Sequence, residues 1–352
     1  MLSLLLGVLL RVLLRLLLGM GVAAFVPLAG AADAADAPYR WQLPPGFPQP
    51  LVPVDNPMST AKVALGRRLF FESRPSVTGR YSCASCHEPQ RAFSDGRALA
   101  LGATGAALHR NAMSLVNVAY NSSYGWDRPS VRLLETQMLT PLFNQHPVEI
   151  GLSGRQRSLL ALLRQDRDYA TAFASAFPAV NSTDSVSTRN MIRAIAAFER
   201  TLIVGNSPFD RYVYGGDHDA INADAKRGLA LFYSARLGCA SCHGGFNFTG
   251  TWNEAGAAPA TPAFACDGVG ARSHRVPTLR NLGLTAPYMH DGRYATLVQV
   301  LSHYEHATVQ SACADKRLRR FELTEAERSQ LLAFLRSLDS PATEFASYAD
   351  GH

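Results

Sequence analysis

The chain has 352 residues, of which 47% are hydrophobic, and a formal net charge of +6. A chain of this length exceeds what one hydrophobic core supports and leaves room for two domains. Two of the basic residues, Arg11 and Arg15, fall in the leader described next. The folded part therefore carries little net charge, and the composition does not favour a nucleic-acid partner.

An apolar run from Leu4 to Val26 is followed by small residues up to Ala37. This pattern is typical of a secretory signal, so we predict a signal peptide at residues 1–34, cleaved near Ala32 or Ala34. Because the run is long, a retained membrane anchor is the alternative. Both readings place the folded part outside the cytoplasm, and we expect a periplasmic protein without stable membrane insertion after cleavage.

The rest of the chain predicts mainly helices. The proline-rich stretch 41–53 predicts an extended arm on the surface. Apolar residues at helical spacing predict helices at 60–71, 130–140, 157–176, 188–203 and 225–232. A capping box formed by Thr324 and Glu327 begins a terminal helix with Leu331 and Leu335 on its apolar face. No segment predicts a substantial sheet, so the predicted fold class is mainly α.

A C-x-x-C-H motif occurs twice. Its two thiols lie about one helical turn apart, so both can attach to one haem edge while the next imidazole reaches the iron. We therefore predict two covalently bound c-type haems. The residues that would hold them are Cys83, Cys86 and His87 for the first haem, and Cys239, Cys242 and His243 for the second.

Two other chemistries use C-x-x-C. Zinc sites built from paired C-x-x-C need pairs about 15–20 residues apart, whereas here the pairs are a domain's length apart. A thioredoxin-type motif expects a preceding strand, but the residues before both motifs predict helix. Cys266 and Cys313 remain. In an oxidising compartment we predict a disulfide between them, with two buried free thiols as the alternative.

Each haem motif follows a helix of similar pattern, at 60–71 and at 225–232, which suggests a duplicated cytochrome c unit. Turn residues at 205–210 separate the copies. We predict two cytochrome c-like haem domains in tandem, at residues 35–204 and 205–352.

Acid–base groups distinguish an enzyme from an electron carrier, because an enzyme leaves one iron open and places such groups beside it. Gln137 and Glu149 lie between the haem motifs in apolar surroundings. They favour an enzyme, although a lone glutamate is more often a surface residue or a helix cap.

The order of these motifs resembles the bacterial di-haem cytochrome c peroxidase and MauG superfamily. The resemblance covers residues 55–338. Stretches 41–48 and 55–59 are most similar to its MbnH branch, the methanobactin-associated di-haem enzymes. The further motifs that carry the resemblance are R-N-A at 110–112, Trp126, P-x-E at 147–149, P-T-L-R-N at 277–281 and A-P-Y-M-H-D-G at 286–292.

The resemblance implies roles for three residues. Glu149 would be the carboxylate over the open iron of the first haem, which reacts with peroxide, and Gln137 would lie beside it. Such a carboxylate can move the proton that peroxide cleavage needs. Trp126 would relay electrons between the haems, with a packed core tryptophan as the alternative. His109 is offset from the family's distal histidine, so we expect a five-coordinate first haem.

The resemblance also implies a calcium ion between the domains. Asn111, Thr285 and Pro287 match its ligands, through one side chain and two main-chain carbonyls. Oxygen-only ligation of this kind suits Ca²⁺.

The sixth ligand of the second haem departs from the peroxidases. Counting from the shared turn at 286–292, their methionine position falls on Tyr304, and Met289 is the only methionine after Met191. A phenolate is hard and anionic, so it lowers the potential and favours oxidised iron. The alternative is a packed Tyr304, with His303 or His290 as the ligand.

The function implied by the resemblance is oxidation of a partner protein. The enzyme would use hydrogen peroxide to form a high-valent di-haem state and oxidise the partner, at a tryptophan side chain, by long-range electron transfer. In the MbnH branch the partner is a small copper-associated protein. The alternative is a peroxidase that takes electrons from a small cytochrome c or cupredoxin, and a non-enzymatic electron carrier ranks third.

Overall fold

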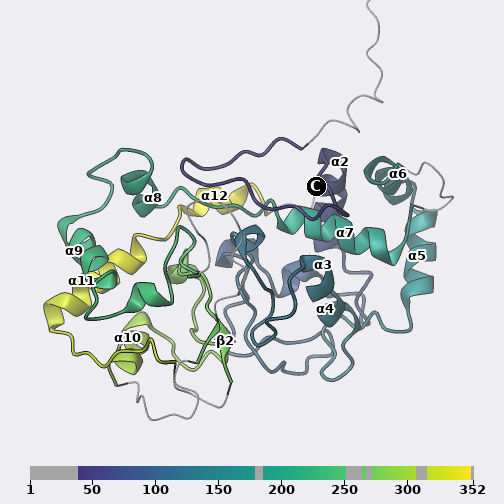
Figure 1. The fold of residues 1–352 in the computed structure, drawn as a ribbon. Coiled ribbons are helices and arrows are strands. Elements are labelled where there is room, and N and C mark those ends of the chain that lie inside the picture. Colours follow the sequence, from purple (N-terminus) through teal and green to yellow (C-terminus); the bar gives the residue numbers. More distant parts are fainter. Residues whose placement is uncertain (1–38, 179–184, 251–263, 267–271, 307–314, 350–352) are drawn as a thin grey trace, which may run out of the picture. The chain divides into compact units, whose positions relative to one another are not determined.

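The computed structural model describes residues 39–178, 185–250, 264–266, 272–306 and 315–349 (Figure 1). The predicted signal peptide and Cys313 lie outside the described residues. The strands in these ranges are β1 (Phe264–Ala265) and β2 (His274–Arg275), which pair antiparallel. Every other regular element described is helical, so the mainly α prediction is confirmed. None of the described helices is long and apolar enough to span a membrane.

The helices fall into two runs along the chain. The first run comprises α2 (Thr60–Phe71), η1 (Cys83–Ser85), η2 (Pro89–Arg91), η3 (Val118–Tyr120), α3 (Leu134–Gln137), α4 (Leu139–Phe143), α5 (Gln156–Gln165), α6 (Arg167–Ala176) and α7 (Thr188–Glu199). The second comprises α8 (Pro208–Val213), α9 (Ala223–Phe232), η4 (Cys239–Ser241), η5 (Leu282–Leu284), α10 (Leu297–His306), α11 (Glu325–Arg336) and α12 (Ala342–Ala346). We call the parts of the chain before and after residue 205 the first and second halves.

Local capping interactions explain which predicted helices are confirmed and which are divided into two helices. The helix at 60–71 and the capping box of Thr324 and Glu327 are confirmed. The segment 157–176 is two helices, because Asp166 is extended and its carboxylate accepts the amides of Asp168 and Tyr169 at the start of α6. The segment 130–140 is likewise split, into α3 and α4, at Met138.

Each half contains one tight helix crossing, α2 with α7 and α9 with α11 (Figure 1). A Cβ at Gly66 would overlap the carbonyl oxygen of Ala194, and one at Gly228 would overlap the carbonyl oxygen of Gln330. Only glycine allows two helix backbones to approach so closely. The equivalent crossings support the inferred duplication of one unit.

The N-terminal arm is extended, as predicted, but it does not lie wholly on the surface. Phe47 is 7% exposed and packs against Tyr120 of the first half and Phe246 of the second, with ring centroids 6.2 and 5.1 Å away. The Arg280 guanidinium lies 4.8 Å from the Phe47 ring centroid. The arm therefore contributes a buried anchor where the two halves meet.

Arg280 belongs to the P-T-L-R-N motif and is 2% exposed. Its guanidinium donates to both carboxylate oxygens of Asp210, at 2.7 and 2.9 Å, and to the Phe246 carbonyl. Asp210 in turn completes a capping box with Ser207 at the start of α8. A buried charge of this kind is retained only with a full set of partners.

Candidate functional site

The first haem motif lies on one wall of a cavity of about 660 Å³. Cys83 and Cys86 lie on and beside the short helix η1, and His87 follows them. The Nδ1 atom of His87 is 2.8 Å from the Phe93 carbonyl oxygen, to which it donates as a neutral imidazole. Burial lowers the pKa of His87, which favours that neutral form. A hydrogen bond from one ring nitrogen to a backbone carbonyl is typical of histidines that bind a metal through the other nitrogen.

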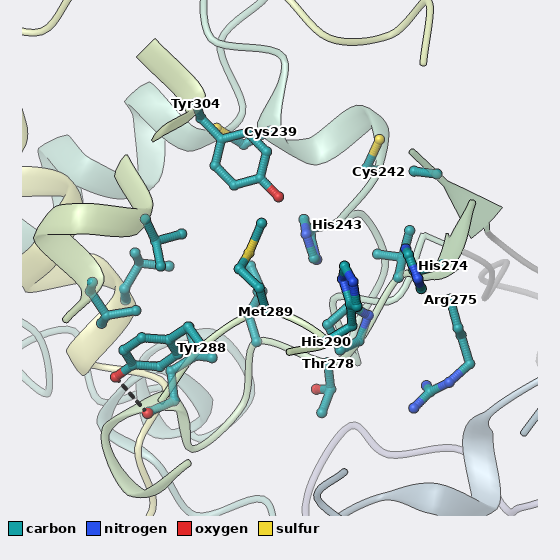
Figure 2. A pocket seen from close by; sticks show the side chains of 18 of the residues that line it. Cys239, Cys242, His243, His274, Arg275, Thr278, Tyr288, Met289, His290 and Tyr304 are labelled. Atoms are coloured by element: carbon teal, nitrogen blue, oxygen red, sulfur yellow. Dashed lines mark hydrogen bonds between the residues drawn. The ribbon is translucent and has the colours of Figure 1, made fainter. Parts of the chain in front are cut away.

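The second haem motif lines a cavity of about 260 Å³ with the same local geometry (Figure 2). Cys239 and Cys242 lie on and beside η4. The Nδ1 atom of His243 is 3.0 Å from the Phe248 carbonyl oxygen. Burial lowers the pKa of His243 to about 4, so this imidazole is neutral too.

Each cavity therefore offers two thiols and one oriented, neutral imidazole. This donor set fits a haem attached through two thioethers and bound through one axial histidine. Burial raises the pKa of the Cys86 thiol to about 12 and that of Cys239 to about 11, whereas a redox-active C-x-x-C lowers a thiol pKa. The described residues contain no cluster of three metal-binding side chains that would suit zinc.

Gln137 and Glu149 line the first cavity together with the haem motif, although they come from different elements. Gln137 ends α3, and Glu149 lies in the loop after α4. The Ala103 amide donates to the Glu149 carbonyl oxygen at 2.6 Å. Burial raises the pKa of Glu149, opposed by the positive charge of Arg128. His109 lines the same cavity but is an exposed residue.

Trp126 lines both cavities. Its indole N–H donates to the Asn111 carbonyl at 3.1 Å. Its ring centroid is 6.4 Å from that of His290, which stacks on His274 at 3.8 Å. Trp126 is thus at the boundary of the two cavities, which is where an electron relay would have to be.

The three residues expected to bind calcium all line the second cavity. The Asn111 amide nitrogen donates to the carbonyl oxygens of Pro287, at 3.4 Å, and Met289, at 2.8 Å. The Asn111 Oδ1 atom is buried and has no hydrogen-bond partner among the described residues. An oxygen atom in this state fits a cation ligand.

Two side chains that could complete the second haem site point into its cavity. Figure 2 shows the Tyr304 hydroxyl, from α10, and the Met289 thioether directed toward the interior lined by His243. His290 lines the cavity as well, whereas His303 is not a lining residue and contacts the Tyr294 hydroxyl at 3.2 Å. Met289 has a φ of 71°, a left-handed conformation that sequence patterns did not predict.

Sequence reasoning also missed two buried charged residues. Glu199, at the end of α7, lines the first cavity, and burial raises its pKa to about 8. Arg275 lines both cavities, and burial lowers its pKa to about 10. Glu199 follows the apolar face of a helix, so periodicity alone gave no sign that it faces a cavity.

Only one of the two cysteines of the predicted disulfide is among the described residues. Cys266 is disulfide-bonded, and it lines the second cavity. Its predicted partner, Cys313, lies outside the described residues.

Residues 60–219 match the family of di-haem cytochrome c peroxidases, and residues 225–339 match cytochrome c. The methylamine utilization protein MauG of Methylophilus methylotrophus is 34% identical over 90% of this chain and 93% of its own. The cytochrome c peroxidase Ccp of Escherichia coli K12 is 31% identical over 84% of this chain and 61% of its own.

The fold agrees with these sequence matches. The crystal structure of a MauG-like protein associated with microbial copper homeostasis superposes with a TM-score of 0.80, at 34% identity, over 89% of this chain and 99% of that one. The sequence matches, the two motifs and their cavities thus lead to one conclusion: this chain belongs to the di-haem cytochrome c peroxidase and MauG family of oxidoreductases, with two tandem cytochrome c domains that imply two covalently bound haem c groups.

Proposed function

We propose that this protein uses hydrogen peroxide to oxidise a partner protein, at a tryptophan side chain, by electron transfer through its two haem sites. The observation that carries this proposal is the Tyr304 hydroxyl in the second cavity. A phenolate ligand stabilises oxidised iron, which suits a site that holds oxidising power. The haems, when bound, supply the electron transfer with peroxide.

Glu149 is the proposed proton-transfer residue. Reduction of one peroxide to two waters takes up two protons and two electrons, and cleavage of the O–O bond requires a proton on the leaving oxygen. Glu149 lines the first cavity, and burial raises the pKa of its carboxyl group, which makes it a better proton acceptor than an exposed glutamate. The Gln137 amide lines the same cavity and would orient the peroxide by hydrogen bonding.

Trp126 is the proposed route between the two haem sites, since it lines both cavities. The electrons would come from a partner too large to enter either cavity. The copper-associated structural neighbour supports a small periplasmic copper-associated protein as that partner. The periplasm is inferred from the predicted signal peptide and from haem attachment to C-x-x-C-H.

A second function is favoured by Met289. Its thioether lines the same cavity as Tyr304. A thioether is a soft ligand that raises the haem potential, so a haem bound by His243 and Met289 would accept electrons from a small cytochrome c or cupredoxin. The protein would then be a peroxidase that removes peroxide.

Two matched variants separate the functions. Under the first proposal, Tyr304→Phe changes the ligation spectrum of one haem and abolishes modification of the partner, and Met289→Leu leaves the spectrum unchanged. Mass spectrometry of a periplasmic extract treated with the enzyme and peroxide detects the oxidised tryptophan. If instead Met289→Leu changes the ligation spectrum and Tyr304→Phe does not, with fast turnover of reduced cytochrome c and no modified protein, the protein is a peroxidase.

We also propose that the boundary between the two haem domains lies near residue 205. A further proposal is a calcium site formed by Asn111, Thr285 and Pro287. The orphaned Asn111 Oδ1 atom supports the calcium site. Asn111→Ala should lower the calcium content of purified protein, measured by atomic emission, while both haems stay attached.

A further inference from the structure

The geometry points to a role for the C-terminal segment in the first haem site. We propose that Tyr348 is a positioning residue that holds the Phe93 carbonyl against the axial histidine His87. Tyr348 belongs to the second half of the chain, so the second half would set the electronic properties of the first haem.

The Phe93 backbone needs support to keep its carbonyl in place. Phe93 has a φ of 58°, and Ala92 before it has a φ of 51°. Two successive non-glycine residues rarely adopt this left-handed conformation. It directs the Phe93 carbonyl to His87 Nδ1 at 2.8 Å.

Ring packing supplies that support from two sides. Phe93 is fully buried, with ring centroids 6.1 Å from Phe70 of α2 and 5.9 Å from Tyr348, at interplanar angles of 72° and 74°. Edge-to-face arrangements of this kind are favourable for aromatic pairs. Tyr348 is therefore one of the two aromatic walls that hold the turn.

The C-terminal segment is itself tied to the first half. The Tyr348 hydroxyl donates to the Thr201 carbonyl at 3.0 Å. Arg67 of α2 donates to the Ser347 carbonyl at 2.8 Å, and the Glu344 carboxylate accepts the Gly205 amide at 3.0 Å. Phe345 is 2% exposed and belongs to the first half's hydrophobic core. These contacts hold the Tyr348 ring in a defined place.

The second haem site builds the same arrangement from its own residues. Phe248, with a φ of 53°, accepts from His243 and packs against Phe232 at 6.0 Å and Phe209 at 5.5 Å. Phe232 follows Gly228 by four residues, as Phe70 follows Gly66. Phe209, from α8, therefore has the place that Tyr348 has in the first half.

The chemical consequence follows from the hydrogen bond. An acceptor on Nδ1–H makes the imidazole a stronger donor to iron and stabilises the oxidised state, so loosening the acceptor raises the potential. Loss of such a partner typically changes metal-site properties by about 10–100-fold. For an indirect effect we expect roughly tenfold in the oxidised-to-reduced ratio, which is about 59 mV for one electron.

A crossed pair of variants tests the proposal in the di-haem protein. Tyr348→Ala should raise the midpoint potential of one haem, and Phe209→Ala should raise that of the other, in a spectroscopic redox titration. Tyr348→Phe keeps the ring and should retain the wild-type potentials. Glu325→Gln, at an exposed position in α11, is the control and should leave both potentials unchanged.

The proposal would be overturned by no shift with Tyr348→Ala, by a shift of both haems, or by a shift of the same haem in both variants. If Tyr348→Ala does not fold, Tyr348→Leu keeps the bulk but not the edge-to-face ring contact and gives the same readout. An equal shift with Tyr348→Phe would assign the effect to the hydroxyl anchor and reject the ring.

Discussion

The two halves of this protein share a helix crossing and a histidine-orienting hydrogen bond, and they differ in the side chains that line their cavities. In each, a glycine crossing brings two helices together, and a phenylalanine carbonyl orients the axial histidine. Glu199 follows Phe198 in the first half, and Leu335 follows Phe334 at the equivalent position, and both line their cavities. The same helix arrangement can thus support two different haem sites, because the side chains that distinguish the sites lie on helix ends and loops.

Carboxylate side chains line the first cavity, whereas none of the described residues that line the second cavity is acidic. Glu149 and Gln137 line the first, and Tyr304 and Met289 line the second. An open site needs proton donors and acceptors, while a closed one needs a sixth ligand. The following predictions test this division.

Glu149→Gln should have the largest effect. General acid–base groups contribute about 10²–10⁴-fold, so the reaction with peroxide should slow by that factor while the content of both haems stays unchanged. Stopped-flow absorbance at the haem band measures the rate. An unchanged rate would return Glu149 to a structural role.

The pH dependence of the wild-type rate should follow from the same residue. Burial raises the pKa of Glu149, so its basic form is lost as the pH falls through that raised pKa. As the pH is lowered, the rate should therefore begin to decline at a higher pH than the titration of an exposed glutamate would give. Glu149→Gln should remove this limb from the profile.

Trp126→Phe should slow electron transfer between the two haem sites. Phenylalanine is much harder to oxidise than tryptophan and lacks the N–H that donates to Asn111. After peroxide is added, the spectral change of the second haem should lag behind that of the first. Trp41→Phe, in the N-terminal arm, is the control. Simultaneous changes at both haems in Trp126→Phe would remove it from the route.

Gly66→Ala and Gly228→Ala should destabilise the protein by similar amounts. Each new Cβ would overlap a helix carbonyl oxygen, and overpacking of this kind costs about 1–3 kcal/mol. Chemical denaturation monitored by circular dichroism measures the loss. If only one variant is destabilised, the two crossings are not equivalent.

The effect of Glu199→Gln should be confined to a pH window. The folded-state pKa of about 8 lies above the value of about 4.3 for an unfolded glutamate, so the folded protein binds the proton more tightly. Wild-type stability should therefore decline as the pH rises from about 4.3 through 8, by up to about 1.4 kcal/mol per pH unit.

The glutamine variant lacks this titration and should show a flatter profile in denaturation at several pH values. Glu325→Gln, which replaces an exposed carboxylate, is the control and should leave the profile unchanged. A wild-type profile that is already flat would mean that Glu199 gains a compensating partner when the haem is bound.

Local signals in the sequence were sufficient for some of the helices and for the haem attachment motifs, although two of the predicted helices are each two helices in the structure. The capping box at Thr324, the periodicity at 60–71 and the C-x-x-C-H spacing each involve residues within a few positions of one another, so their geometry follows from the backbone alone. The helices of similar pattern before both haem motifs likewise indicated the duplicated unit.

Contacts between distant residues were decided only by the tertiary structure. Met289 enters the cavity of Tyr304 because its turn adopts a left-handed conformation, which no spacing predicts for methionine. Tyr348 contacts Phe93 although the two residues are far apart in the sequence, beyond the range of any periodic pattern. Such contacts depend on how the halves pack, because burial and cavity shape arise from the whole fold and not from neighbouring residues.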